Sequence, residues 1–141
     1  MGFLLVIFMI ELGHWTSKVE FIENSIGFIY KITNNIDGRK YLGRKLILFK
    51  TSRKPLKGNK NKRRGTKQSD YMTYCGSCIE LQEDIKKLGK ENFTFEILEW
   101  CSSKLTLNYA EVKHIVNSNA IFDKNYYNKY LGCRLVNKIK I

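Results

Sequence analysis

A chain of 141 residues has the size of one ordinary domain, which leaves room for one core and none for a separate DNA-reading domain. Hydrophobic residues make up 43% of it and aromatic residues 13%, which excludes an intrinsically disordered chain. Lysine and arginine number 25 against 13 acidic residues, a formal net charge of +12, so a polyanion, and above all nucleic acid, is the expected partner.

The first 26 residues are expected to form an extension whose order the sequence leaves open, ahead of a single domain at residues 27–141. The apolar run at residues 3–10 is much shorter than the ~20 residues that span a bilayer, so no membrane partner is predicted. It has no basic residue before it and no small-residue cleavage site after it, which argues against a signal peptide. We interpret it as a packed strand or helix, or as the product of an upstream start codon with Met9 as the alternative start.

A β-hairpin is predicted next. Residues 27–33 are rich in aromatic and β-branched side chains, and residues 34–38 supply the turn. Residues 39–44 then form the returning strand.

Two tyrosines of this hairpin are candidate functional residues. By the period of two in a strand, Phe28, Tyr30 and Ile32 share one face, and Tyr41 lies on the paired strand close enough to act with Tyr30 on one substrate group. The alternative is that the two tyrosines form an ordinary cross-strand packing pair.

Residues 50–67 are predicted to form an irregular basic loop. They show no hydrophobic periodicity and contain nine basic residues, the single proline, Pro55, and Gly58 and Gly65. Two interpretations stay open, a solvated loop or an ordered wall of a DNA groove. The candidate nucleic-acid-binding residues in and before this loop are Lys45, Lys54, Lys57, Lys60, Lys62, Arg63, Arg64 and Lys67.

The second half of the chain predicts helix, strand and helix. Ser77 and Glu80 form a capping-box pattern for a helix at residues 78–88 that Gly89 ends, and residues 93–98 alternate as a third strand. Ser102 or Ser103 caps a second helix. Its expected buried stripe consists of Leu105, Tyr109, Val112, Ile115 and Val116.

The cysteines are Cys75, Cys78, Cys101 and Cys133, and without a secretion signal they are expected to be reduced thiols of a cytoplasmic protein. The spacing of the first pair could be half of a zinc site or a dithiol redox motif. No second close pair supports zinc, and residues 69–74 form no convincing core strand before a redox motif. The pair is interpreted as small residues at a helix start.

Glu111 lies at the border of the expected stripe, about 40° around the helix from Ile115. A carboxylate there lines a cleft, or it is a rim glutamate paired with a lysine. His114 lies opposite the stripe and is predicted to be a surface residue, and His14 belongs to no motif.

A family resemblance changes the weight of these residues. Gly27-Phe-Ile-Tyr30, followed after a short turn by Tyr41-Leu-Gly43, resembles the motif pair of the GIY-YIG nuclease family. Residues 74–81 and 88–98 resemble the helix and third strand of phage homing-type members. Glu111 falls where the family keeps a metal-binding glutamate, and Asn128 where it keeps a late asparagine. The similarity runs from Gly27 to Gly132.

The resemblance implies an α/β (α+β) fold with a three-stranded antiparallel sheet flanked by helices. It implies a metal-dependent DNA endonuclease in which Glu111 holds Mg²⁺, with Mn²⁺ as the alternative. By analogy Tyr30 is the general base, Tyr41 positions the water or the phosphate, and Asn128 completes the site. A phage protein acting in the host cytoplasm is the expected source.

Departures from the family pattern leave alternatives open. Phe28 stands where the first motif has a glycine, and Leu42 is the middle residue of the second. Arg44 and Arg53 are both candidates for the catalytic arginine. Homing, restriction, repair and host-DNA breakdown stay open, as does the oligomeric state. The alternative function is a non-catalytic nucleic-acid-binding module, which would gain nothing from a carboxylate such as Glu111 in its cleft.

Overall fold

The computed structural model describes residues 10–58, 60–61 and 63–131, with the side chains of Arg53 and Arg63 also left undescribed. The strands in this part of the chain are β1 (Thr16–Ser17), β2 (Gly27–Asn34), β3 (Lys40–Leu46), β4 (Leu48–Arg53), β5 (Arg63–Gln68) and β6 (Phe93–Cys101). The helices there are α2 (Ile79–Leu88) and α3 (Lys104–Asn117), with short 3₁₀ turns η1 (Tyr71–Thr73), η2 (Lys90–Asn92) and η3 (Ala120–Phe122).

The main sheet has four strands in the order β1-β6-β2-β3. The predicted α+β class is confirmed, and the predicted hairpin is the β2–β3 pair. The prediction of a purely antiparallel three-stranded sheet was wrong, because β1 pairs in parallel with β6 at the far edge. A strand of two residues is too short to show any periodicity, so its sequence carries no signal for it.

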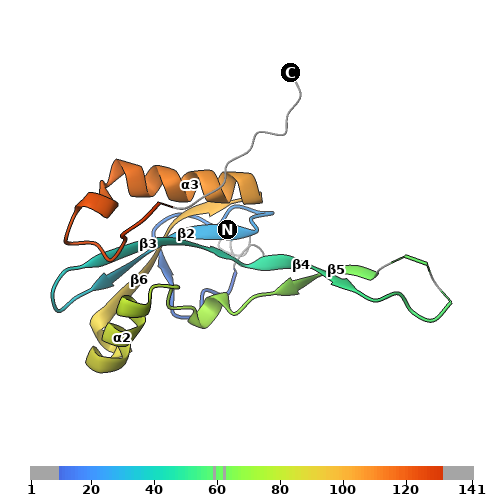
Figure 1. The fold of residues 1–141 in the computed structure, drawn as a ribbon, viewed down its shortest axis with the longest axis horizontal. Coiled ribbons are helices and arrows are strands. Elements are labelled where there is room, and N and C mark those ends of the chain that lie inside the picture. Colours follow the sequence, from blue (N-terminus) through green and yellow to red (C-terminus); the bar gives the residue numbers. More distant parts are fainter. Residues whose placement is uncertain (1–9, 59, 62, 132–141) are drawn as a thin grey trace, which may run out of the picture.

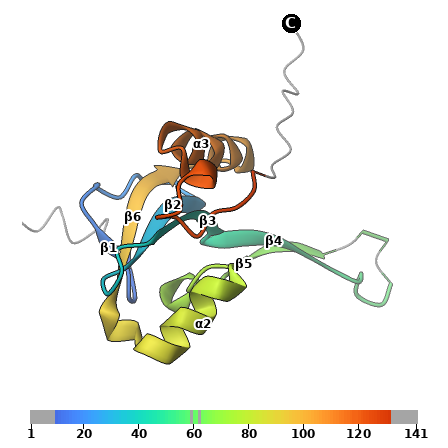
Figure 2. The ribbon, with the colours of Figure 1, turned by 60° about the vertical axis from the view of Figure 1, so that its left-hand side comes forward.

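Helices cover both faces of this sheet (Figures 1 and 2). The helix α3 lies on one face and α2 on the other, with β2 between β3 and β6. Residues 27–30 of β2 are all buried because both sides of the strand are covered. On the α2 face the core contains Trp15, Phe28, Tyr30, Ile32, Phe93, Phe95, Ile97 and Trp100, and on the α3 face it contains Ile29, Cys101, Leu107 and Ala110.

β6 is longer than predicted because it contains an irregularity. Its register against β2 shifts between Ile29 and Tyr30, which leaves Leu98 as an extra residue. Leu98 packs on the α3 face, and the alternation resumes one residue out of step, with Trp100 in the α2-face core. Regular alternation therefore stops at Leu98 in the sequence although the strand continues to Cys101.

Residues 50–53 and 63–67 belong to strands, so the prediction of an irregular loop was wrong for half of this stretch. β4 and β5 pair antiparallel from Leu48↔Gln68 to Arg53↔Arg63 and form a hairpin that projects from the body (Figure 1). Backbone pairing joins the two strands, and no described side chain of either strand is fully buried. The described side chains of the hairpin strands are exposed or half-buried, so no apolar alternation marks them in the sequence.

Both predicted helices are confirmed, but they are capped differently. Ser103 caps α3 by accepting the Thr106 amide, and Thr106 returns a bond to the Ser103 amide. The predicted capping box of α2 was wrong, because Cys78 is its N-cap and no side chain caps it. The Ser77 hydroxyl is instead near that of Tyr41, and Glu80 forms ion pairs elsewhere.

The prediction of the buried stripe of α3 was right for Ile115, which is buried, and in part for the half-buried Val112, but wrong for the other three residues. Leu107, Ala110 and Ile115 are buried, whereas Leu105, Tyr109 and Val116 are exposed. This helix is apolar on two sides, so the period of its hydrophobic residues does not tell which side faces the sheet. The interpretation of His114 as a plain surface residue was wrong as well. His114 is half-buried, and its Nε2 is 3.0 Å from the Glu99 carboxylate on β6.

The segment after η3 runs alongside the outer edge of β3. The Lys40 amide donates to the Asn125 carbonyl, and the Tyr127 amide donates to the Lys40 carbonyl. The Asn128 side chain continues this pairing at Leu42. The edge of β3 is therefore covered up to Leu42.

Cys75, Cys78 and Cys101 are free thiols, as predicted, and Cys133 lies outside the described residues. The apolar run at residues 3–10 is outside them too, except for Ile10. None of the described helices has the length and apolar character that crossing a membrane would need.

Candidate active site

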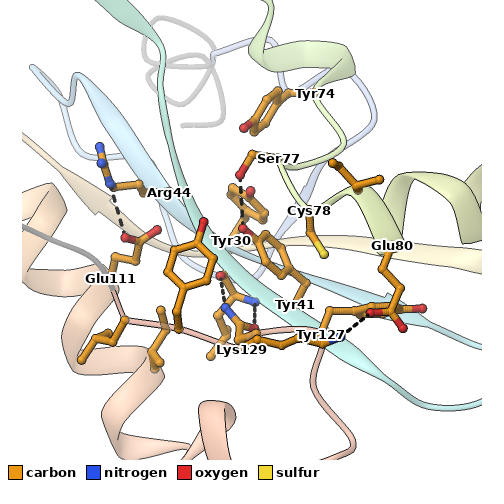
Figure 3. A pocket seen from close by; sticks show the side chains of 16 residues that line it. Tyr30, Tyr41, Arg44, Tyr74, Ser77, Cys78, Glu80, Glu111, Tyr127 and Lys129 are labelled. Carbon is orange, nitrogen blue, oxygen red and sulfur yellow. Dashed lines mark hydrogen bonds and ion pairs between the residues drawn. The ribbon is translucent and has the colours of Figure 1, made fainter.

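A pocket of about 560 Å³ lies at the β3 edge of the sheet, against the segment 127–131 (Figure 3). Its walls come from both faces of the sheet, since α2 and α3 each contribute side chains. The residues that line it include Tyr30, Tyr41, Arg44, Tyr74, Ser77, Cys78, Glu80, Glu111, Tyr127, Asn128, Lys129 and Tyr130.

Tyr30 reaches this pocket by crossing β3 at a glycine. Tyr30 is paired with Gly43, and its ring lies across that residue. A Cβ at Gly43 would be 2.5 Å from the Tyr30 Cζ and would overlap the hydroxyl oxygen. The glycine of Tyr41-Leu-Gly43 therefore makes room for the tyrosine of the first motif, which is a stronger constraint than strand propensity.

The Tyr30 hydroxyl is buried and forms no hydrogen bond of good geometry with the described residues, although the Tyr74 side chain lies beside it. Burial, followed by the neighbouring Tyr41, Tyr74 and Glu111, raises the pKa of this phenol well above its usual value. An orphaned polar atom in a core is costly, and at a pocket wall it marks a position where a ligand or a water molecule completes the bonding.

Tyr41 lies beside Tyr30, with ring centroids 6.1 Å apart. Its hydroxyl is 3.4 Å from Ser77 Oγ, and burial raises its pKa despite that contact. Gly76, with a φ of +86°, lets the chain before α2 pass close to both rings, since a Cβ there would be 3.3 Å from each. The predicted proximity of the two tyrosines is therefore found, with α2 closing over them.

Glu111 approaches the same edge from the opposite face of the sheet. Its side chain is 19% exposed, and Arg44 Nε is 3.4 Å from its Oε1. Burial raises the pKa of the Glu111 carboxyl, while Arg44 opposes the shift. The alternative of a rim glutamate paired with a lysine is not what is found, because the partner is Arg44, itself a candidate residue.

Asn128 is held by the backbone of β3. Its Oδ1 accepts the Leu42 amide at 3.0 Å, and its Nδ2 donates to the Leu42 carbonyl at 2.9 Å. Both ends of the amide are used, so Asn128 is a buried structural clamp between the C-terminal segment and the strand that carries Tyr41.

Several lining residues were not predicted as functional. The Tyr74 ring lies 6.1 Å from the Tyr30 ring, with Lys45 Nζ 3.9 Å above it. Lys129 Nζ is 3.1 Å from Glu80, and Tyr130 is 80% exposed at the rim. Tyr74 opens the segment that resembles the family and could have been found there, whereas the others follow from tertiary contacts alone.

The predicted nucleic-acid-binding residues divide into groups. Lys45 is engaged, with its Nζ 2.7 Å from Asp70 Oδ1, and this partner lowers the pKa of that carboxyl. Of the predicted residues, those exposed in the described hairpin and its tip are Lys54, Lys57, Lys60, Arg64 and Lys67. Lys62 lies outside the described residues, as do the side chains of Arg53 and Arg63, and the backbone puts Arg53 at the hairpin end of β4 while Arg44 lines the pocket.

The donor set of the pocket fits a hard divalent cation that keeps most of its own water. Among the described residues no group of three or more His, Cys, Asp or Glu side chains could enclose a metal ion. Glu111 is the pocket carboxylate with an incomplete set of partners, and the orphaned Tyr30 hydroxyl faces the same space. One carboxylate with water and phosphate oxygens is a coordination that Mg²⁺ accepts.

Comparison with known proteins gives a consistent result. The sequence profile described as "Putative endonuclease segE, GIY-YIG domain" matches residues 12–131. A protein of Enterobacteria phage T4 named "Putative endonuclease segE" is 34% identical over 106 residues, which are 74% of this chain and 41% of that relative. The chain therefore spans less than half the length of the relative it matches. No solved structure matches significantly.

Proposed function

The chain belongs to the GIY-YIG endonuclease family, and on that premise we propose that it hydrolyses phosphodiester bonds of DNA in the pocket at the β3 edge. The observation that carries the proposal is the convergence of the orphaned Tyr30 hydroxyl and the Glu111 carboxylate on one space, from opposite faces of the sheet. Packing alone does not explain that convergence, because each group is costly to bury.

We assign Glu111 as the ligand of a divalent cation, Mg²⁺ first and Mn²⁺ as the alternative. When bound, the ion supplies stabilisation of the negative charge that builds on the phosphate and on the leaving oxygen. Arg44 holds the Glu111 carboxylate in place and, with its side chain 40% exposed, has further N–H groups for the phosphate. Arg44 is preferred to Arg53 as the catalytic arginine because it lines the pocket.

Tyr30 Oη is the proposed acceptor of the proton from the attacking water, a role that requires the phenolate form. Burial and Glu111 raise the pKa of this phenol, and a divalent cation held by Glu111 would oppose that shift. Tyr41 orients the water or a phosphate oxygen beside Tyr30 Oη. The missing partner of Tyr30 is what leaves its oxygen free for that contact. Asn128 acts as a positioning residue, since both ends of its side-chain amide bond to Leu42 and fix the β3 backbone next to Tyr41.

Nicking of supercoiled plasmid at low salt, with Mg²⁺ and then Mn²⁺, tests the proposal. We expect the native chain to cut and Glu111→Gln to cut at least about 100-fold more slowly, since even outer partners of a metal contribute 10- to 100-fold. Its DNA affinity should stay unchanged. Glu83→Gln is the matched control, because Glu83 is exposed on α2. This variant should cut at the native rate.

A binding module without catalysis is the second candidate, favoured by the exposed basic β4–β5 hairpin. If the native chain and Glu111→Gln bind DNA equally and neither cuts with either metal, the nuclease proposal is wrong and the binding module replaces it.

A further inference from the structure

The β4–β5 hairpin is a two-stranded ribbon with no core of its own to bury. It extends past the four-stranded sheet (Figure 1), and its described side chains are exposed apart from the half-buried Thr51. Residues 48–68 contain no aspartate or glutamate. The ribbon is therefore a cationic arm that contributes little to folding.

The register divides the ribbon into two faces, because directly opposed residues of an antiparallel pair share a face. One face, here called the polar face, follows from the pairs Lys50↔Thr66, Ser52↔Arg64 and Leu48↔Gln68. Apart from Leu48 at its base it carries only hydrogen-bonding side chains, namely Lys50, Ser52, Arg64, Thr66 and Gln68. The opposite face carries Phe49, Thr51, Gly65 and Lys67.

The ribbon follows directly on β3, the strand that carries Arg44. The chain bends at Ile47, where the amides of Ile47 and Leu48 both donate to the Ile26 carbonyl, so the alternation of side chains in β3 does not continue unbroken into β4. The ribbon nevertheless begins two residues after the end of β3. A duplex that reaches the Arg44–Glu111 wall of the pocket would therefore meet the ribbon as well.

The cations of the polar face have no competing partner in the described part of the chain. None of the ion pairs formed by the described residues involves Lys50 or Arg64. Lys45, one strand earlier, is by contrast neutralised by Asp70. Lys50 and Arg64 therefore remain available for DNA phosphates and base edges.

We propose that the β4–β5 ribbon lies in the major groove of duplex DNA and reads base edges with its polar face; this rests on the proposed function, whose pocket would hold the phosphate to be cut. The major groove, about 12 Å wide, admits a two-stranded ribbon. Arginine and lysine recognise guanine, glutamine recognises adenine, and serine and threonine bond to several base edges. The ribbon would thus set a sequence preference beside the cut.

Selection of bound duplexes from a random pool tests this without cleavage if the protein carries Glu111→Gln. The test variant adds Ser52→Ala, Thr66→Ala and Gln68→Ala, which change no charge and should leave overall DNA affinity nearly intact. We expect the preference at the contacted base pairs to fall by roughly 5- to 150-fold each. Thr51→Ala, on the opposite face, is the matched control and should keep the preference.

Several results would overturn the proposal: a parent protein without any preference, a triple variant that keeps it, or a triple variant that binds all sequences more weakly to the same extent. Plasmid cutting by the native chain is measured in parallel. Selection with preference but without cutting leaves the ribbon proposal standing and removes the nuclease proposal. Cutting without any sequence preference removes the ribbon proposal and leaves the nuclease proposal standing.

Discussion

The hydroxyl of Tyr30 is buried without a hydrogen bond of good geometry to the described residues, so folding gains nothing from it. Phenylalanine would pack equally well at this position. We therefore expect Tyr30→Phe to raise the free energy of unfolding by about 1 kcal/mol, measured by urea unfolding, because an unsatisfied buried group is removed. Plasmid nicking should fall by about 10²- to 10⁴-fold, because the proton acceptor is lost.

The matched control is Tyr71→Phe. The Tyr71 hydroxyl donates to the Glu11 carbonyl at 2.8 Å, so its loss should lower the free energy of unfolding by about 0.5–1.5 kcal/mol and leave nicking unchanged. A Tyr30→Phe protein that is less stable than the native chain, or that nicks normally, would remove Tyr30 from the mechanism.

Gly43 is the residue that allows Tyr30 to cross β3. A methyl group at this position would overlap the Tyr30 side chain, which is fully buried and has no room to move away. We expect Gly43→Ala to lower the free energy of unfolding by about 1–3 kcal/mol, as overpacking does, and to abolish nicking. In the double variant with Tyr30→Leu part of the stability should return while nicking stays absent.

Gly65→Ala on β5 separates this effect from the general cost of replacing a strand glycine. The nearest atom to a new Cβ there is Thr51 Oγ1 at 3.4 Å, an ordinary contact. Equal losses of stability at both positions would show that the crossing of Tyr30 over Gly43 is not the cause.

At the scale of elements, α2 and the C-terminal segment are tied together by a charged network beside the pocket. Arg39 contacts Glu80 at 2.8 Å and Asp84 at 2.6 Å, and its guanidinium lies 4.3 Å from the centre of the Tyr127 ring. The Tyr127 hydroxyl donates to Asp84, and burial raises its pKa to about 12, so it stays protonated as a donor. The network holds Asn128, one residue later, against β3.

The β4–β5 hairpin behaves differently, since it projects from the sheet and shares none of its core. We expect replacement of residues 53–63 by Asn-Gly, a two-residue turn suited to joining Ser52 and Arg64, to leave Tm unchanged. DNA binding should weaken, and the slope of log K against log salt should fall by about 0.9 for each phosphate that the shortened protein no longer neutralises. A large fall in Tm, or an unchanged salt slope, would show that the tip is structural.

At the scale of the whole molecule, stability should depend on pH through His14. Burial, and secondarily Lys90, lowers the pKa of this imidazole from 6.5 to about 4, while the ring stacks on Phe95 at 4.1 Å. Between about pH 6.5 and 4, His14 is therefore protonated in the unfolded chain but neutral in the folded chain. The free energy of unfolding should therefore be level above about pH 7.5 and decrease as the pH falls from about 6.5 towards 4.

Urea unfolding at half-unit steps of pH checks this. His14→Phe should remove the decline between about pH 6.5 and 5, whereas His114→Gln should keep it. Below about pH 5 the carboxyls of Asp37, Asp70 and Glu80, whose pKa values are lowered in the fold, add a further loss in every variant. A decline that survives His14→Phe would assign the dependence to other groups.

The sequence by itself determined the family, the β2–β3 hairpin, both helices, most of β6, and Tyr30, Tyr41 and Glu111 as candidates. Such features are local or lie in motifs, where neighbouring residues carry the signal. β1, the end of β6 past Leu98 and the β4–β5 pair were missed or misjudged because two residues, an irregular register and an exposed ribbon leave no periodic pattern.

Tertiary structure alone decided which side of α3 faces the sheet, since that helix is apolar on two sides, and hence what surrounds Glu111. It also decided that Arg44 forms an ion pair with Glu111, that the Asn128 side chain bonds to the Leu42 backbone, and that Lys45 forms an ion pair with Asp70. Each of these pairs joins residues distant in the chain. Their partners are chosen by sheet register and packing, which no local stretch of sequence encodes.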